Sequence, residues 1–153
     1  MNIIYVGYFK MPDGTASAQL IRGMAKIAVT AGYNVVIIDV GIDDSISYAG
    51  EKTYEIDEAK VVAIRYPKSI KGEVLKRLSF KTIKKHIPDG SVVMFYNYSS
   101  LVMLKSFIYR KKGYISIPII TEWYSAGEIE GIKSVFSCCL KKIDIDLRMR
   151  IVS

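Results

Sequence analysis

The sequence predicts an α/β fold: a Rossmann-like, doubly wound and mostly parallel sheet flanked by helices. The first reason is its opening, in which an apolar strand run, a helical repeat and a second strand run follow at Asn2–Gly7, 15–31 and Val35–Asp39. The second reason is that the strand runs are almost entirely apolar, as in parallel sheets covered by helices on both faces. The third is the alternation of strands with helices, which favours parallel crossovers.

The rest of the chain continues this alternation. The polar stretch 41–59 predicts a loop or short hairpin, with 53–56 as an edge strand. From there the pattern predicts a strand at 61–66, a basic amphipathic helix at 71–86, a strand at 91–96, a helix at 99–112 and a strand at 114–121. A further helix is predicted at 129–141, and a last helix or strand at 143–152. Pro118 disfavours a central position for its strand, because proline cannot donate a ladder hydrogen bond.

Composition indicates one globular domain that spans residues 1–153. About half of the residues are hydrophobic and a quarter are charged, which is ordinary for such a fold. The adjacent pair Cys138-Cys139 suits neither a disulfide nor a zinc site. No apolar run is long enough to span a bilayer, and the amino terminus lacks the pattern of a signal peptide, so a cytoplasmic protein is expected.

The net charge of +7 indicates an anionic partner. Basic residues concentrate in three stretches, 71–85, 105–112 and 141–150, although each could also be a solvated helix face. Nucleic-acid signatures are absent, so an anionic membrane surface is the favoured partner and nucleic acid is not. Peripheral docking on the inner membrane face would use the basic helix, through Lys76, Arg77, Lys81, Lys84 and Lys85.

Ligands of such sheets bind beyond the carboxyl ends of the strands, and three segments lie there. The first is the loop that precedes the first helix, whose amino-terminal amides favour an anion. Gly14 in this loop would allow a ligand to approach the backbone closely. The alternative is that Asp13-Gly14 forms a plain turn, while Asp13 or Thr15 caps the helix.

The other two segments follow the strands 91–96 and 114–121. Asn97 could orient a sugar hydroxyl or a phosphate, or it could cap the next helix, as Ser99 or Ser100 could equally do. Glu122, Trp123 and Tyr124 combine a carboxylate with two aromatic rings, which suits a carbohydrate. The alternative for this group is a tryptophan at the core edge beside a solvated glutamate.

Several near-motifs carry no function. Asp144-Ile145-Asp146 has the Asp-x-Asp spacing of metal-dependent sugar transferases, but this spacing is common by chance. His86 fits the carboxyl end of a helix better than a catalytic role. The phosphate-binding loop of P-loop NTPases does not occur. No metal and no cofactor are therefore expected.

Five segments carry a resemblance to a known family: Gly14–Gln19, Met24–Lys26, Ala31–Val36, Tyr96-Asn97 and Ile120–Tyr124. In these segments, which extend over nearly the whole chain, the sequence resembles the amino-terminal domain of family 4 glycosyltransferases with the GT-B fold. This resemblance implies two Rossmann-like domains that face each other, of which the amino-terminal one binds the acceptor. Many members carry a histidine after the fourth strand, where this chain has Asn97, so a histidine role does not transfer.

The resemblance implies the acceptor-binding half of an enzyme of polysaccharide biosynthesis. The full enzyme would move a sugar from a nucleotide sugar to a lipid-linked or polysaccharide acceptor. Gly14, Thr15 and Ser17 would meet the donor diphosphate, and the residues 97 and 122–124 would line the acceptor side. A carboxy-terminal donor domain is not found in residues 1–153, so the chain alone is expected to lack transferase activity.

The alternative function is a nicotinamide dinucleotide-binding Rossmann domain of an oxidoreductase. Asp39 ends the second strand, about where a carboxylate would bind the ribose. The Gly-x-Gly-x-x-Gly fingerprint is missing, however, and the loop 8–15 is long for a dinucleotide turn.

Overall fold

A computed structural model describes residues 1–12, 14–100, 102, 104, 113–119, 143, 144, 146 and 147, with Arg77 described by its backbone alone. The described part is a six-stranded sheet in the order β3-β4-β2-β1-β5-β6. All neighbouring pairs are parallel except β3 with β4. The strands are β1 Asn2–Gly7, β2 Asn34–Asp43, β3 Gly50–Ile56, β4 Ala59–Pro67, β5 Val92–Tyr96 and β6 Ile115–Ile119. The predicted mostly parallel α/β fold is confirmed.

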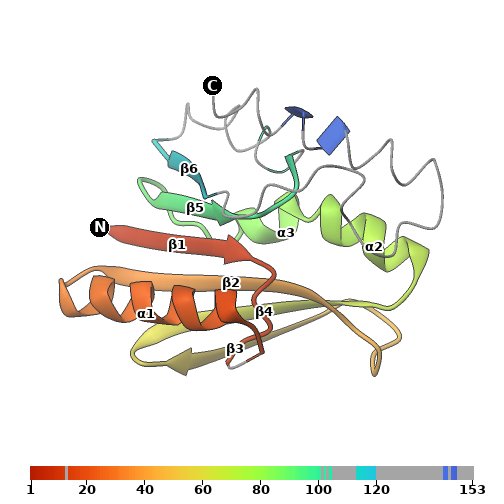
Figure 1. Cartoon of the computed structure of the whole chain (residues 1–153), viewed down its shortest axis with the longest axis horizontal. Coiled ribbons are helices and arrows are strands. Elements are labelled where there is room, and N and C mark those ends of the chain that lie inside the picture. Colours follow the sequence, from red (N-terminus) through yellow and green to blue (C-terminus); the bar gives the residue numbers. More distant parts are fainter. Residues whose placement is uncertain are drawn as a thin grey trace.

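The helices cover both faces of this sheet and create two cores (Figure 1). Helix α1 (Ala16–Thr30) packs on one face, where Ile21 and Ile37 are almost fully buried. Helices α2 (Ile70–Arg77) and α3 (Phe80–Lys84) lie on the other face, where α3 packs Phe80 and Ile83 against the sheet. Successive strand residues point to opposite faces, so the continuous apolar runs of the central strands supply both cores.

Helix α1 follows the sequence prediction closely. Thr15 caps its start, because the Thr15 hydroxyl oxygen accepts a hydrogen bond of 3.1 Å from the Ala18 amide. At its end, Gly32 has a φ of +84° and the Tyr33 amide bonds back to the Ala28 carbonyl. This is a Schellman ending, for which glycine is the preferred residue.

The hairpin of β3 and β4 is longer than predicted. β3 begins at Gly50 instead of residue 53, and it forms the predicted edge strand. The connecting residues Asp57 and Glu58 both have positive φ values, 48° and 65°. Two-residue hairpin turns require this conformation and usually contain glycine or asparagine, so the turn was not recognised from the sequence.

The predicted helix 71–86 is divided into two helices, and the apolar side of the first one faces outward. Leu78 and Ser79 separate α2 from α3. The Ser79 hydroxyl is buried, where it lies 2.6 Å from the Tyr98 hydroxyl and donates to the Lys76 carbonyl over 2.7 Å. These side-chain bonds replace helix bonds at the break.

The exposed side of α2 is apolar. Ile70 is 88% exposed, and three further apolar side chains of this region are 40–49% exposed: Val74, Leu75 and Leu78. Gly72 instead faces the body of the protein, and a Cβ at this position would lie 1.9 Å from the Pro67 carbonyl oxygen. Of the apolar side chains in the segment 71–86, Ile83 therefore packs into the core, whereas those of α2 do not.

The described carboxy-terminal elements agree with the prediction as far as they extend. Pro118 lies in β6, the last strand of the described sheet, opposite Phe95. Gly113 precedes this strand with a φ of +79°. Residues 143, 144, 146 and 147 are helical, whereas the predicted segment 129–141 lies outside the described residues.

Candidate functional site

The loop between β1 and α1 is held by one buried carboxylate, Asp39 in β2. Its Oδ1 accepts hydrogen bonds from the amides of Phe9 (2.9 Å) and Lys10 (3.1 Å), and its Oδ2 accepts one from the amide of Met11 (2.9 Å). Asp39 reaches this loop because it lies opposite Gly7, the last residue of β1. The loop conformation therefore depends on a side chain of the neighbouring strand.

Arg65 of β4 completes this arrangement. Its Nη2 lies 2.5 Å from Asp39 Oδ2, and its Nη1 donates to the Asp39 carbonyl over 2.7 Å. The Asp39 side chain is 1% exposed and that of Arg65 is 23% exposed. A carboxylate buried to this degree is costly unless it is paired and hydrogen-bonded, and Arg65 and the three amides meet this need.

The network presents Lys10 in an unusual conformation. Lys10 has a φ of +54°, in the left-handed region that residues other than glycine rarely adopt. Its carbonyl accepts a 2.9 Å hydrogen bond from the Gly14 amide. A Cβ at Gly14 would lie 2.3 Å from the Lys10 carbonyl oxygen, so glycine at position 14 makes room for the backbone of Lys10.

A cavity of about 410 Å³ opens at the carboxyl edge of β1, β2 and β4, and we call it the crevice. The loop after β1 contributes Tyr8 and Lys10 to its wall, β2 contributes residues 40–42, and α2 contributes Glu73 and Lys76. The full lining is Tyr8, Lys10, Val40, Gly41, Ile42, Asp44, Arg65, Lys68, Glu73 and Lys76. Its position agrees with the strand-end rule, and its volume suits a small ligand.

Ion pairs order most of the charged groups in the crevice. Lys68 Nζ lies 2.6 Å from Asp44 Oδ2, and Lys76 Nζ lies 2.8 Å from Glu73 Oε2. The hydrogen bond to Asp44 raises the pKa of Lys68. No ion pair or hydrogen bond of the Lys10 ammonium group occurs within the described part of the chain. Lys10 is thus the cation that a bound anion would meet without breaking a protein pair.

One aromatic side chain, Tyr8, lines the crevice, and it packs on the buried Tyr98. The Tyr8 ring lies 4.6 Å from the Tyr98 ring and 5.0 Å from the Lys76 ammonium group, measured between or to ring centroids. Tyr98 is fully buried, and this burial together with the nearby Tyr8 raises the pKa of its hydroxyl well above the usual value. Tyr98 is therefore neutral, and its hydroxyl can donate a hydrogen bond to the Lys76 carbonyl of α2. This contact connects α2 to the residue on which Tyr8 packs.

The three residues predicted to meet a diphosphate lie together at the start of α1. The Thr15 hydroxyl donates to the Phe9 carbonyl over 2.8 Å, and the Ser17 hydroxyl lies 2.8 Å from Thr15 Oγ1. Because Thr15 has given its single proton to Phe9, Ser17 is the donor of the second bond. Gly14, Thr15 and Ser17 are not part of the crevice lining, and their role toward a diphosphate remains a prediction.

The residues predicted to bind an acceptor are described only in part. Asn97 follows β5 with a φ of +44°, and its amide donates to the Ile119 carbonyl over 2.9 Å. Asparagine tolerates this conformation better than most residues. The backbone conformation alone therefore explains why asparagine occupies position 97. Glu122, Trp123 and Tyr124 lie outside the described residues.

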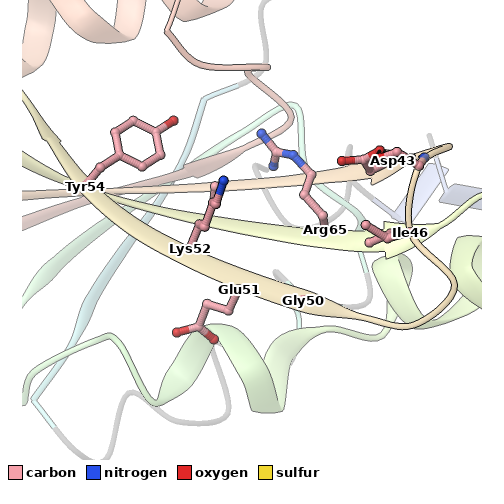
Figure 2. A pocket seen from close by; sticks show the side chains of 9 residues that line it. Asp43, Ile46, Gly50, Glu51, Lys52, Tyr54 and Arg65 are labelled. Carbon is pink, nitrogen blue, oxygen red and sulfur yellow. Dashed lines mark hydrogen bonds between the residues drawn. The ribbon is translucent and has the colours of Figure 1, made fainter.

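A second cavity, of about 450 Å³, lies on the β3–β4 hairpin, and we call it the hairpin cavity. Figure 2 shows Lys52, Tyr54 and Arg65 on the same face of the hairpin, while Glu51 points to the opposite face. Arg65 lines both cavities. The hairpin cavity is made by the edge of the sheet and lacks any residue of the loop after β1.

The basic residues of the predicted docking helix have different environments. The Lys76 side chain is only 19% exposed and faces the crevice, contrary to the expected membrane-facing position. Lys81 is exposed, Lys84 is half-buried, and Lys85 is exposed with its ammonium group 2.6 Å from Glu51. Lys81 therefore agrees best with an outward-facing role.

His86 links the edge strand to the end of α3. Its Nε2 lies 3.0 Å from Glu51 Oε1. Burial alone would raise the pKa of Glu51, but the hydrogen bond from the Lys85 ammonium group and the nearby His86 ring outweigh it and hold this pKa below its usual value. This contact supports the structural reading of His86 that the sequence favoured.

The Asp-x-Asp near-motif also has a structural contact. Asp144 Oδ1 accepts hydrogen bonds from the amide (3.0 Å) and the hydroxyl (2.5 Å) of Ser100. Asp144 thus caps the segment that follows β5. Within the described ranges, no group of three or more histidine, cysteine or acidic side chains could hold a metal ion.

Sequence reasoning missed three residues of the site and gave a fourth, Asp39, a different role. Lys10, Arg65 and Lys68 line the crevice, and Asp39 positions two of them. A signal for Lys68 was present, because it directly follows a strand end. Arg65 was also visible as a charged residue in an otherwise apolar strand, which calls for a buried partner.

No family model and no curated protein matches this chain. Among solved structures, the chain is similar to an E. coli structure described as trehalose-6-phosphate bound with UDP-2-fluoro glucose. The TM-score is 0.53 and the sequence identity is 6%, and the alignment covers 99% of this chain and 42% of that chain. UDP-2-fluoro glucose is a nucleotide sugar. The similarity concerns the fold alone, and the chain spans less than half the length of that protein.

Proposed function

We propose that the chain is the acceptor-binding half of a family 4 glycosyltransferase. The full enzyme would move a sugar from a nucleotide sugar to a glycan or lipid-linked acceptor. The observation that carries this proposal is the crevice at the carboxyl edge of the sheet, on a fold shared with a nucleotide-sugar-binding protein. Its charged groups can hydrogen-bond to sugar hydroxyls, and the Tyr8 ring can pack on an apolar sugar face.

In this proposal the two ends of the β1–α1 loop have different tasks. Lys10 and Tyr8 would face the acceptor, and Gly14, Thr15 and Ser17 would lie nearest the donor diphosphate. The half-buried hydroxyls of Thr15 and Ser17 at a helix amino terminus are compatible with an anion nearby. A second domain would hold most of the nucleotide sugar.

Binding and transfer measured on residues 1–153 test this function. We expect sugars to shift the amide resonances of crevice residues such as Tyr8 and Ile42 in NMR titrations. We also expect no transfer of glucose from UDP-glucose to any sugar in the panel used for these titrations, because residues 1–153 would lack most of the contacts to the donor. Rapid transfer by this chain alone would contradict the half-site, and a panel of sugars without any effect on the crevice would contradict acceptor binding.

The alternative, a nicotinamide-binding domain, gains no support from Asp39. Both carboxylate oxygens of Asp39 are engaged by loop amides and Arg65, and the side chain is buried. It is therefore not available to a ribose. A titration followed by NADH fluorescence is the discriminating experiment, and saturable micromolar binding would favour the oxidoreductase.

We further propose that the outer face of α2 docks on an anionic membrane surface. The apolar side chains of Ile70, Val74 and Leu78 are exposed, and so are the basic residues Lys71 and Lys81 of the same segment. Apolar groups that enter the lipid boundary, flanked by cations, are typical of interfacial helices. The net charge of +7 favours anionic lipid. Among the described helices, none combines the length and apolar character needed to cross a bilayer.

Vesicle co-sedimentation tests the docking face. The double variant Val74→Asp/Leu78→Asp is expected to lower partitioning onto phosphatidylglycerol vesicles by about tenfold or more, because two apolar side chains lose their burial. Leu20→Asp/Ile27→Asp is the matched control, since both residues are exposed on α1 at the other face of the sheet. Equal losses in both double variants, or no binding by the parent chain, would contradict docking through α2.

A further inference from the structure

We propose that the crevice contains a phosphate-binding subsite centred on Lys10, so that the ligand of this site carries a phosphate group. The inference rests on the proposed function, because it names the ligand class of the same site. The phosphate could belong to a phosphorylated acceptor sugar or to the diphosphate of a nucleotide sugar. In both cases an ammonium group would meet a phosphate oxygen through a charge-assisted hydrogen bond.

The charge balance of the crevice favours an anionic ligand. Four cationic side chains line it, against two carboxylates, Asp44 and Glu73. Asp44 pairs with Lys68, Glu73 pairs with Lys76, and the buried Asp39 beneath the lining pairs with Arg65. The Lys10 ammonium group has no such partner among the described residues. A phosphate that binds Lys10 would also lie within the field of the other three cations.

The backbone that presents Lys10 is also unusual. A left-handed conformation is unfavourable for a residue with a Cβ, and such strain clusters at functional sites. The Lys10 amide is fixed by Asp39, and its carbonyl is fixed by Gly14, where any larger residue would collide. The loop is thus organised to hold one lysine at the rim of the cavity. Gly14, predicted from sequence to approach a phosphate, would act through the position of Lys10.

The test uses NMR titrations of the full chain with inorganic phosphate, glucose 6-phosphate, UDP and glucose. We expect saturable phosphate shifts at the amides of Lys10, Asp44 and Lys68. Lys10→Ala is expected to weaken phosphate binding by about tenfold, the usual scale for loss of one charge-assisted contact. Lys52→Ala is the matched control, because it removes an exposed lysine of the hairpin cavity. Whichever of glucose 6-phosphate and UDP loses affinity in Lys10→Ala identifies the source of the phosphate.

A second variant, Lys10→Gln, keeps a long polar side chain and guards against a change in folding, which circular dichroism would detect. Equal losses in Lys10→Ala and Lys52→Ala would indicate general charge attraction and overturn the subsite. Phosphate binding that survives both Lys10 variants, or the absence of saturable phosphate binding, would also overturn it. Glucose binding that does not depend on Lys10, without phosphate binding, would overturn the subsite and leave acceptor binding intact. Phosphate binding through Lys10 with no added affinity from any sugar would support the subsite and contradict acceptor binding.

Discussion

Replacement of Asp39 by alanine is expected to destabilise the protein by about 3–5 kcal/mol, the range measured when one partner of a buried ion pair is removed. The variant would leave Arg65 without its carboxylate partner, and the amides of Phe9, Lys10 and Met11 would lose their hydrogen-bond acceptor. Most domains are stable by only about 5–15 kcal/mol, so a large share of the stability would be lost. The loop after β1 would also no longer hold Lys10 at the crevice.

Urea unfolding followed by circular dichroism measures this effect, and two further variants separate its causes. Asp39→Asn preserves the shape but turns an amide group toward Arg65 or Met11, so we expect an intermediate loss. Asp57→Asn removes the charge that pairs with Arg22 on the surface and keeps a residue that tolerates the positive φ of the turn, so it is expected to leave the unfolding midpoint nearly unchanged. If Asp39→Ala were as stable as Asp57→Asn, the network around Asp39 would not support the loop.

The opening of the fold could be predicted from sequence because its signals are local. The apolar run of β1, the helical repeat of α1 and the glycine at position 32 each specify one element without reference to the rest of the chain. The predicted limits of these elements differ from the observed ones by only a few residues. The edge strand β3 was harder, because its turn uses two acidic residues in a conformation that usually signals glycine or asparagine.

Helix α2 shows where a local pattern is insufficient. Val74, Leu75 and Leu78 have helical spacing, and this periodicity identifies an apolar side of the helix. It cannot say whether that side meets the sheet or the surroundings. The orientation is set by contacts distant in sequence, in which Ser79 bonds to Tyr98 and Lys76 packs over Tyr8. The usual assumption that apolar residues face inward therefore failed for this helix.

The site was predictable in position but not in composition. The strand-end rule correctly located a crevice beyond β1, β2 and β4. The residues that line it depend on strand register, since Asp39 reaches the loop only because it lies opposite Gly7 and beside Ala63. Without that register, Asp39 looked like a ribose ligand and Arg65 had no evident partner. The residues 122–124 stay a prediction.

The smallest substitution with a large expected effect is Gly72→Ala, at the start of α2. A Cβ at this position would lie 1.9 Å from the Pro67 carbonyl oxygen and 3.1 Å from the Pro67 carbonyl carbon. These atoms are backbone and cannot move aside as a flexible side chain could. Alanine is better than glycine in a helix by about 1 kcal/mol, but steric overlap of this kind typically costs about 1–3 kcal/mol or more. We therefore expect net destabilisation.

The same substitution at Gly23 of α1 is the matched control. A Cβ there would meet no atom within 4 Å, so Gly23→Ala is expected to stabilise the protein by about 0.4–1 kcal/mol. The same chemical change at two helical glycines is thus expected to shift the urea midpoint in opposite directions, downward for Gly72→Ala and upward for Gly23→Ala. Because α2 carries Lys76 into the crevice, displacement of this helix should also shift the amide resonances of Tyr8 and Lys10 in Gly72→Ala. Stabilisation by Gly72→Ala would show that α2 does not approach Pro67 closely. The positions described for Lys76 and for the exposed apolar side of α2 would then also be wrong.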